Sequence, residues 1–319
     1  MISSGYNSMK PASRRQVLRV SAVVAAGAAF RGVPAEAKAP DLRFVSVGDW
    51  GRNGHDDQRA VSRAMASTCA RVRPSHILST GDNFYENGVS SVHDPQWKTS
   101  FETIYDAASL QVPWRVILGN HDYRGDVQAQ IDYQDRGLRW QLPARTYRRG
   151  ETLPDGTSCD FFYIDTNPFL SRYKGTEVRI DGQDTAAQLR WLDGALASST
   201  AAWKIVVGHH PIYTAHGGRL DEPELIAAID PLLRQHGVRI YINGHVHNFQ
   251  HVRVRGIDYI TNGAGSRIEG ASGGQAGGVV LLRHGFMSAS LDRNVFAFAF
   301  LGTDNQTLYR ATLPRLAEL

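Results

Sequence analysis

The sequence of 319 residues predicts an α/β protein in which buried strands alternate with amphipathic helices. Three observations favour this fold class. Two segments have apolar residues at helical spacing, a C-terminal segment alternates with a period of two, and several short runs are apolar throughout. Runs that are apolar on both faces are typical of strands buried between layers, so we expect helices to cover the sheet. Five such runs occur, at residues 44–47, 76–80, 115–118, 204–207 and 239–243.

Both predicted helices precede a predicted strand. Residues 185–196 form the first helix and residues 224–235 the second. Their apolar faces carry Leu189, Leu192 and Leu196 in the first helix and Leu225, Ile229, Leu232 and Leu233 in the second. Near the C-terminus, residues 296–300 and 308–313 alternate in the manner of strands and are joined by a turn-forming segment at 302–306. This region is therefore predicted to be an antiparallel hairpin.

Each of the five apolar runs ends near a glycine that is followed at once by a residue able to bind a metal ion. In open α/β sheets, ligands bind beyond the carboxyl ends of the strands, where glycine permits a close approach. We therefore expect the five strand ends to converge on one site. With a tyrosine three residues beyond the second of these positions, they offer seven oxygen or nitrogen ligands: Asp49, Asp82, Tyr85, Asn120, His209, His245 and His247.

Seven ligands indicate two metal ions. One divalent ion rarely uses more than about six protein groups while it keeps an open position, whereas two ions that share a bridging carboxylate would use all seven. Such pairs stabilise both the attacking and the leaving oxygen of a phosphoryl displacement, so hydrolysis of a phosphate ester is the expected chemistry. Taken singly, each residue is more often a turn cap or a packed core side chain than a metal ligand. The recurrence at five strand ends favours the metal site.

The distribution of charge argues against a nucleic-acid partner. The net charge is +4 and the pI about 9.1, but five basic residues and one acidic residue lie within the first 37 positions. The remainder holds 30 basic and 30 acidic residues and no Lys/Arg run. Binding to a phosphate backbone needs clusters of positive charge, so no nucleic-acid partner is expected.

Residues 1–37 are predicted to be an export signal, and residues 38–319 a single domain. The stretch Ser13-Arg14-Arg15-Gln16-Val17-Leu18 precedes an uncharged segment at 20–30 and a small-residue cleavage pattern at 35–37. The run resembles a twin-arginine signal, with Val17 where that motif usually has Phe. Eleven residues are too few to span a bilayer, so no stable membrane insertion is expected. The twin-arginine export machinery is therefore a predicted partner, and the predicted location is periplasmic or secreted. A disordered basic tail or a membrane anchor is the alternative.

Cys69 and Cys159 are the only cysteines. Two cysteines are too few for a disulfide scaffold, and their spacing is wrong for a zinc knuckle. Both a disulfide formed after export and two buried apolar thiols are consistent with the sequence.

The motifs around these ligands resemble those of the metallophosphoesterases, and more narrowly those of the purple acid phosphatases of the small, single-domain, tartrate-resistant type. The residue that distinguishes this branch is Tyr85, three positions after Asp82. The resemblance covers about residues 42–315 and implies a four-layer fold, with two mixed β-sheets packed as a sandwich and flanked by helices. It rests on Gly48-Asp49-Trp50-Gly51, Gly81-Asp82-Asn83-Phe84-Tyr85, Gly119-Asn120-His121-Asp122, Val206-Val207-Gly208-His209 and Gly244-His245-Val246-His247.

The resemblance also implies a role for each ligand. Asp82 would bridge a ferric ion and a divalent ion, the latter being Fe, Zn or Mn. The ferric ion would be held by Asp49, Tyr85 and His247, and the divalent ion by Asn120, His209 and His245. Carboxylate and phenolate oxygens suit a hard trivalent ion, whereas Asn and His suit a divalent transition metal. The stronger Lewis acid keeps its hydroxide at lower pH, so an acidic optimum is expected.

The expected reaction is attack of a metal-bound hydroxide on a small phosphomonoester, without a phosphoenzyme. His121 is expected to stabilise or protonate the leaving oxygen, and Asp122 to orient His121. Asn83, His210 and His216 are expected to bind substrate. For His210 the alternative is packing beside Pro211, and for His216 an ordinary loop position.

Two other functions are also consistent with these residues. A phosphodiesterase or nucleotidase would use the same two-metal site, because the loops around the pocket set the preference for ester type. A secreted metal- or phosphate-binding protein would keep the ligands without turnover. The presence of His121 and Asp122 argues against such a binding protein, since it needs no acid for a leaving group.

Overall fold

The computed structural model describes residues 41–315, apart from residue 138 and the segments 216–220 and 271–277. The predicted export signal and His216 therefore lie outside the described residues. Residues Ala39–Leu319 form one compact unit, and all the described residues belong to it.

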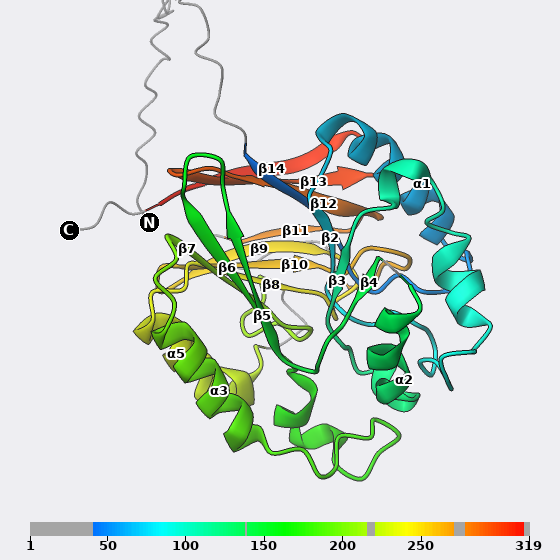
Figure 1. Ribbon diagram of the computed structural model, residues 1–319, viewed down its shortest axis with the longest axis horizontal. Coiled ribbons are helices and arrows are strands. Elements are labelled where there is room, and N and C mark those ends of the chain that lie inside the picture. Colours follow the sequence, from blue (N-terminus) through cyan, green and yellow to red (C-terminus); the bar gives the residue numbers. More distant parts are fainter. Residues whose placement is uncertain (1–40, 138, 216–220, 271–277, 316–319) are drawn as a thin grey trace, which may run out of the picture. The chain divides into compact units, whose positions relative to one another are not determined.

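Two seven-stranded mixed sheets form the centre of this unit (Figure 1). The first sheet has the order β14-β13-β12-β1-β2-β3-β4, and the second β11-β9-β10-β8-β7-β6-β5. The first contains β1 (Leu42–Val47), β2 (His76–Ser79), β3 (Trp114–Val116), β4 (Trp140–Gln141), β12 (Gly285–Leu291), β13 (Val295–Gly302) and β14 (Thr307–Pro314). The second contains β5 (Tyr147–Thr152), β6 (Ser158–Tyr163), β7 (Trp203–Val207), β8 (Ile240–Asn243), β9 (Phe249–Val254), β10 (Ile257–Asn262) and β11 (Val279–Leu281).

The predicted strands are divided between the two sheets. Strands β1 to β4 are parallel to one another, as are β6, β7, β8 and β10, and antiparallel strands complete both sheets. A single open sheet is therefore not formed. The two-sheet arrangement implied by the resemblance is confirmed, and it brings three predicted strand ends from the first sheet towards two from the second.

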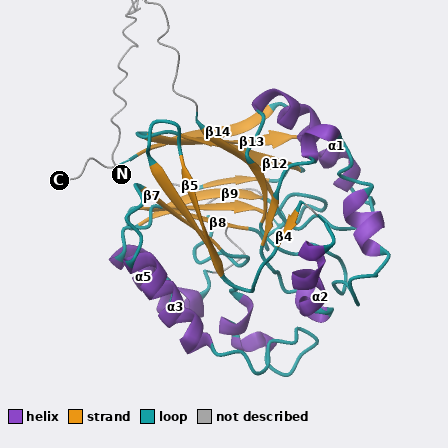
Figure 2. Cartoon of the chain, viewed as in Figure 1, coloured by secondary structure: helices purple, strands orange, loops and turns teal. Residues whose placement is uncertain are grey.

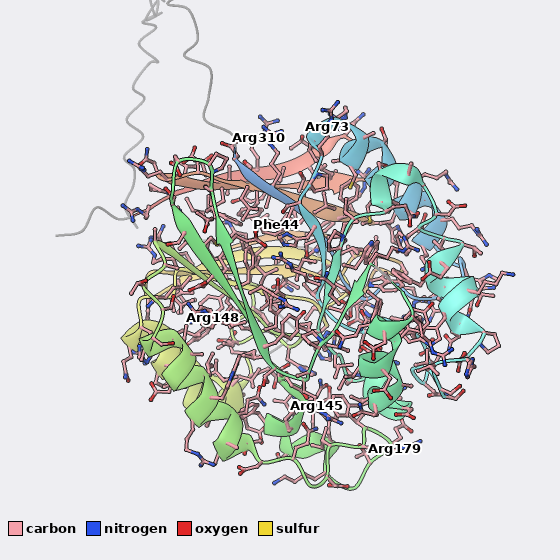
Figure 3. The ribbon with its side chains drawn as sticks, viewed as in Figure 1. Phe44, Arg73, Arg145, Arg148, Arg179 and Arg310 are labelled. Carbon is pink, nitrogen blue, oxygen red and sulfur yellow. The ribbon has the colours of Figure 1, made fainter. Side chains whose placement is uncertain are left out.

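Aromatic side chains fill the space between the sheets. Phe44 of β1 packs edge-on against Phe161 of β6 at 5.5 Å, and Phe249 of β9 stacks on Phe300 of β13 at 4.5 Å, measured between ring centroids. Figure 3 shows Phe44 in this interior. The predicted hairpin is confirmed as β13 and β14, in which the alternation turns Phe296, Phe298 and Phe300 into the core.

Helices lie outside the two sheets (Figure 2). The α-helices are α1 (Gln58–Val72), α2 (Val127–Asp132), α3 (Thr185–Ala197), α4 (Pro223–Ala228) and α5 (Asp230–Gln235). A six-residue π-helix occupies Trp97–Glu102, and three-residue 3₁₀ turns occupy Ala108–Leu110, Asp122–Arg124, Tyr133–Asp135, Asn167–Phe169 and Ser171–Tyr173. Leucines of α3 and α5 pack with Val206 and Tyr241 on the second sheet, which forms a second core cluster.

The second predicted helix, 224–235, is wrong as one continuous element. It is divided into α4 and α5 near Ile229. Pro231 lies in the first turn of α5, and proline lacks the N–H that a continuous helix would bond to the preceding turn. Leu225, Ile229 and Leu233 are nevertheless all buried, so the predicted apolar face is preserved.

Cys69 on α1 and Cys159 on β6 are buried free thiols. Burial raises the pKa of Cys69 to about 12, so this thiol stays protonated at neutral pH. The two cysteines act as small apolar core residues. Among the described residues, no helix combines the length and the apolar character needed to cross a bilayer.

Candidate metal centre and active site

The predicted ligands lie on loops that follow the carboxyl ends of strands in both sheets. Asp49 follows β1, Asp82 follows β2, His209 follows β7 and His245 follows β8. Hydrogen bonds join these loops across the sheets. The amide of His245 donates to Asp49 Oδ2 over 3.0 Å, and His209 Nδ1 lies 2.8 Å from the carbonyl oxygen of Thr80. The ends of two separate sheets thus form one site.

Two of the glycines that precede the predicted ligands are required because a side chain there would collide with the site. Gly81 has φ +91°, and a Cβ there would lie 2.6 Å from His209 Nδ1. At Gly119 the Cβ would lie 2.1 Å from Asp82 Oδ1, far inside contact distance. The loops approach so closely that a side chain at these positions would displace the ligands themselves.

One group of ligands gathers around the phenol of Tyr85. Its oxygen lies 3.1 Å from Asp49 Oδ1, 3.0 Å from Asp82 Oδ2 and 3.0 Å from His247 Nε2. His247 Nε2 is also 3.5 Å from Asp49 Oδ1. Three oxygen donors and one nitrogen donor therefore converge on a single point, a set that suits a hard cation.

A second group shares Asp82 with the first. Asp82 Oδ1 lies 3.5 Å from His209 Nε2, while Asn120 Oδ1 lies 3.0 Å from His245 Nδ1. The rings of His209 and His245 are 5.2 Å apart. The two oxygens of Asp82 thus face different groups, which is the geometry of a bridging carboxylate.

An unsatisfied nitrogen shows that this donor set fits a cation. His209 is fully buried, and its Nε2 has no hydrogen-bond partner although its Nδ1 is fixed by Thr80. Ligand atoms of Asp49, Asp82 and His209 lie within 4.8 Å of one another. Two buried carboxylates at such a separation repel each other unless positive charge lies between them. The residues present therefore fit a pair of metal ions.

Burial and the neighbouring charges also shift the pKa values of Asp82, His209 and Tyr85. Burial alone would raise the pKa of Asp82, but the imidazoles of His209, His121 and His245 hold it well below its usual value. Burial opposes the charge on His209, yet Asp82 and Asp49 raise its pKa to about 9. Burial, followed by Asp49 and Asp82, raises the pKa of Tyr85 well above its ordinary value. Tyr85 therefore becomes a phenolate only where a strong cation compensates its charge.

Three ligands also have strained backbones. Asp49, Asp82 and His245 have φ of 59°, 51° and 68°, in the left-handed region that non-glycine residues rarely adopt. Each costs about 1–2 kcal/mol, and such residues concentrate at functional sites. The bond from His245 N to Asp49 Oδ2 and that from Asp49 N to Gly81 O, both 3.0 Å, hold these loops in place.

His121 stands at the rim of the centre. Its ring packs against that of Tyr85, with 4.3 Å between centroids, and its Nε2 lies 4.0 Å from Asp82 Oδ2. Its Nδ1 lies 2.7 Å from the carbonyl oxygen of Glu86. The side chain is 16% exposed, so it faces both solvent and the ligands.

Asp122 and Asn83 occupy different places from those expected. Asp122 is fully buried and accepts hydrogen bonds from Gly119 N, Asn83 and Gln130, whereas Glu86 holds His121. Burial, followed by the charge of Asp82, raises the pKa of Asp122 to about 7. Asn83 is also fully buried and donates to the carbonyl of Ile117. These two side chains fix the loops beneath the centre, and neither is exposed to a substrate.

His210 is buried beside the second ligand group. Its Nδ1 lies 2.8 Å from Thr166 Oγ1, its Nε2 lies 2.9 Å from the hydroxyl of Tyr173, and its ring is 4.2 Å from that of His245. The imidazole therefore packs between the ligands and the Tyr173 loop, with both nitrogens engaged. His216, the other predicted substrate-binding histidine, lies outside the described residues.

Two residues at the site were not predicted from the sequence. Glu86 accepts from His121 through its backbone, and its carboxylate lies 2.7 Å from Arg52 Nη1. The Arg52 guanidinium stacks over Tyr85, 3.5 Å from the ring centroid. The sequence feature that could have identified them is their place beside two motifs. Glu86 directly follows Tyr85, and Arg52 directly follows Gly48-Asp49-Trp50-Gly51.

Comparison with known proteins identifies a phosphoesterase family and acid phosphatases as similar to this chain. The calcineurin-like phosphoesterase family matches residues 42–249. The chain is 39% identical over 241 residues to purple acid phosphatase 17 of Arabidopsis thaliana, covering 71% of this chain and 69% of that protein. It is 31% identical over 310 residues to tartrate-resistant acid phosphatase type 5 of Homo sapiens, covering 89% and 94%.

Solved structures share the fold. One is GAP50, described as the anchor in the inner membrane complex of Plasmodium, with a TM-score of 0.77, 26% identity, and coverage of 87% of this chain and 90% of that chain. Another is purple acid phosphatase PPD1 from yellow lupin seeds, with a TM-score of 0.65 and 16% identity, covering 87% of this chain and 54% of that one.

Proposed function

Because the chain belongs to the purple acid phosphatases, within the calcineurin-like phosphoesterase family, we propose that it hydrolyses small phosphomonoesters at a dinuclear centre of Fe(III) and a divalent ion. The observation that carries this proposal is the position of Asp82, whose two oxygens face the two ligand groups at 3.0 and 3.5 Å. A carboxylate with separate partners on its two oxygens is what a metal pair requires.

The donor chemistry supports the choice of ions. Asp49, Tyr85 and His247 supply two oxygens and one nitrogen, which suits Fe(III), whereas Asn120, His209 and His245 suit Fe, Zn or Mn in the divalent state. When bound, such a pair activates a water molecule and neutralises the phosphoryl oxygens during an in-line displacement.

His121 is the group that this chain offers to the leaving oxygen. Its Nδ1 donates to the carbonyl of Glu86, so in the imidazolium the remaining proton is on Nε2. Asp82 Oδ2 lies 4.0 Å from that nitrogen. His121 can therefore transfer a proton from Nε2 to the departing alkoxide, and the Glu86 carbonyl keeps the ring oriented as it does so.

We also propose export of the folded protein by the twin-arginine machinery to the periplasm or outside the cell. The order of twin arginine, uncharged segment and cleavage pattern in residues 13–37 supports this proposal.

A comparison of ester types tests the proposed activity. We expect kcat/KM for 4-nitrophenyl phosphate to exceed that for bis(4-nitrophenyl) phosphate by at least about tenfold, because the chain's relatives are acid phosphatases. Both activities should disappear with a chelator and return with metal. A preference for the diester would identify a phosphodiesterase instead. Absence of turnover by fully metallated protein would favour a binding role instead.

A further inference from the structure

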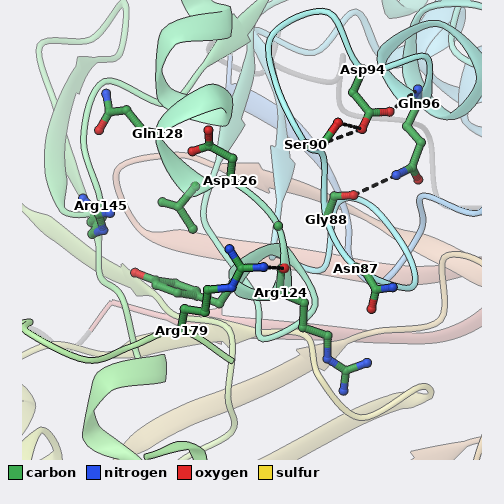
Figure 4. Close-up of a pocket in the computed structure, with 13 residues that line it drawn as sticks. Asn87, Gly88, Ser90, Asp94, Gln96, Arg124, Asp126, Gln128, Arg145 and Arg179 are labelled. Atoms are coloured by element: carbon green, nitrogen blue, oxygen red, sulfur yellow. Dashed lines mark hydrogen bonds between the residues drawn. The ribbon is translucent and has the colours of Figure 1, made fainter. Parts of the chain in front are cut away.

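A cavity of about 670 Å³ is lined mostly by charged and polar residues (Figure 4). Its walls include Asn87, Gly88 and Ser90, which follow Tyr85 in the chain, and residues 123–128, which follow His121. Arg145 and Arg179 complete it from distant parts of the chain. A volume of this size is typical of sites that bind small molecules.

Three arginines give the cavity its charge. Arg124, Arg145 and Arg179 line it together with two carboxylates, Asp94 and Asp126. In Figure 4, Asp94 is drawn at the opposite side of the view from Arg145. The lining therefore has an excess of positive charge, carried by side chains whose planar forks match phosphate oxygens.

The two carboxylates are already engaged by their own loops. Asp94 accepts hydrogen bonds from Ser90 N at 2.7 Å and Gln96 N at 2.8 Å. Asp126 caps α2 by accepting from Ala129 N at 3.1 Å. Neither forms an ion pair with a cavity arginine within the described part of the chain.

The arginines, in contrast, keep unused donors. Arg145 Nε is buried without a hydrogen-bond partner, and the acid that its charge reaches, Asp165, is already bonded by Tyr123 and Asn167. Arg179 donates to the backbone oxygen of Arg124 over 3.0 Å and forms no ion pair with an acid of the described residues. Arg145 is half-buried, and a half-buried guanidinium with a free N–H group is stabilised by an anion.

Arg124 connects the cavity to the reaction. Its Nη1 donates to the carbonyl oxygen of Glu86 over 3.4 Å, and this is the same oxygen that holds His121 Nδ1 at 2.7 Å. The side chain that faces the leaving oxygen and the first arginine of the cavity therefore meet at one backbone atom. Arg124 also pairs with Glu177 at 3.1 Å, but Glu177 is 68% exposed and such a pair contributes little. Arg124 therefore marks the border between the cavity and the proposed active site, one backbone atom away from His121.

We propose that this cavity binds a second phosphoryl group carried by the leaving group, so that the preferred substrates are small bisphosphorylated molecules. The proposal rests on the proposed phosphomonoesterase activity, because it assigns the cavity to the leaving-group side of that reaction. It identifies Arg179, Arg145 and Arg124 as the residues that determine this specificity.

Fructose 1,6-bisphosphate and fructose 6-phosphate are suitable probes, since they differ by the second phosphoryl group. We expect kcat/KM for phosphate release to be about tenfold or more higher for the bisphosphate, and Arg179→Gln to remove most of that ratio. The side chain of Arg179 is exposed, and among the described residues its hydrogen bond is to a backbone oxygen, that of Arg124, so its replacement should not disturb folding. The matched control is Arg190→Gln, an arginine that is 71% exposed on α3 and does not line the cavity; its ratio should equal that of the wild type.

Calorimetric binding of fructose 1,6-bisphosphate gives a second readout when the wild type and each variant also carry His121→Ala, because slow turnover then leaves the ligand intact during the titration. Arg179→Gln should bind about tenfold more weakly than the wild type and Arg190→Gln equally well. Equal ratios and equal affinities in the wild type and Arg179→Gln would overturn the proposed subsite while leaving the phosphatase proposal intact. Weakened binding, combined with a wild type that hydrolyses neither sugar phosphate, would support the subsite and overturn the phosphatase proposal.

Discussion

Replacement of Asp82 by asparagine is expected to lower kcat by about 10³-fold or more and to remove at least one metal ion per chain. The change keeps the size of the side chain and an oxygen able to accept from His121 N, which now lies 2.8 Å from Oδ1. It removes the negative charge that faces Tyr85 and His209 from its two oxygens. Two cations without this bridge would repel each other at close range. Metal analysis and initial rates on 4-nitrophenyl phosphate measure the two effects.

The stability of the metal-free protein separates this loss from misfolding. Asp49 and Asp82 are both buried and lie close together, so removal of one charge should leave the melting temperature of the metal-free Asp82→Asn protein equal to or above that of the metal-free wild type. Asp184→Asn is the matched control, because that carboxylate is exposed and caps α3, a role that asparagine also fills. A metal-free Asp82→Asn protein that melts well below the wild type, or one that retains both ions and full activity, would contradict the bridging role.

Replacement of His121 by alanine is expected to lower kcat by about 10²- to 10⁴-fold while both metal ions remain bound. The imidazole packs on Tyr85 and is held by Glu86, but it contributes none of the ligand contacts of Asp49, His209 or His245. The loss should be greater for an alkyl phosphate than for 4-nitrophenyl phosphate, because a poor leaving group depends more on a proton donor. Rates on both esters and metal content measure this prediction.

His93→Ala provides the control for His121. His93 is exposed, and its contact with Arg136, at 3.5 Å, lies at the surface, so its replacement should leave rates on both esters unchanged. Equal losses of activity and metal in His121→Ala would show that His121 supports the centre structurally. Equal losses on both esters, with the metals retained, would show that it donates no proton to the leaving group.

The residues that converge at the candidate metal centre could be predicted from the sequence, because the close packing of their loops requires glycines beside them. At Gly81 and Gly119 any side chain would collide with His209 or Asp82, so each ligand loop begins with a glycine directly after an apolar strand. A short stretch of sequence is enough to recognise such a pattern. The division of the strands into two sheets cannot be predicted from short stretches, because it depends on pairings such as β1 with β12, which lie more than 200 residues apart in the chain.

The roles of the neighbouring residues depend on contacts that sequence spacing does not express. Asp122 follows His121 directly, yet it turns inward to Asn83 and Gln130, and the backbone of Glu86 takes the place expected for it. Every residue has a backbone carbonyl, so the sequence does not indicate which of them binds His121. For the same reason the arginine cavity was not predicted, because Arg124, Arg145 and Arg179 are separated in the chain and meet only in the folded protein.

The visible absorption spectrum of the metallated protein, measured beside Tyr85→Phe and with total metal analysis, tests the central claim most directly. A phenol whose oxygen lies within 3.1 Å of two carboxylates, with a pKa raised by burial, ionises only against a strong cation. We expect two metal ions per chain and a broad charge-transfer band that disappears in Tyr85→Phe. A fully metallated protein without such a band, or a band that persists in Tyr85→Phe, would contradict the assignment of Tyr85 to a ferric ion.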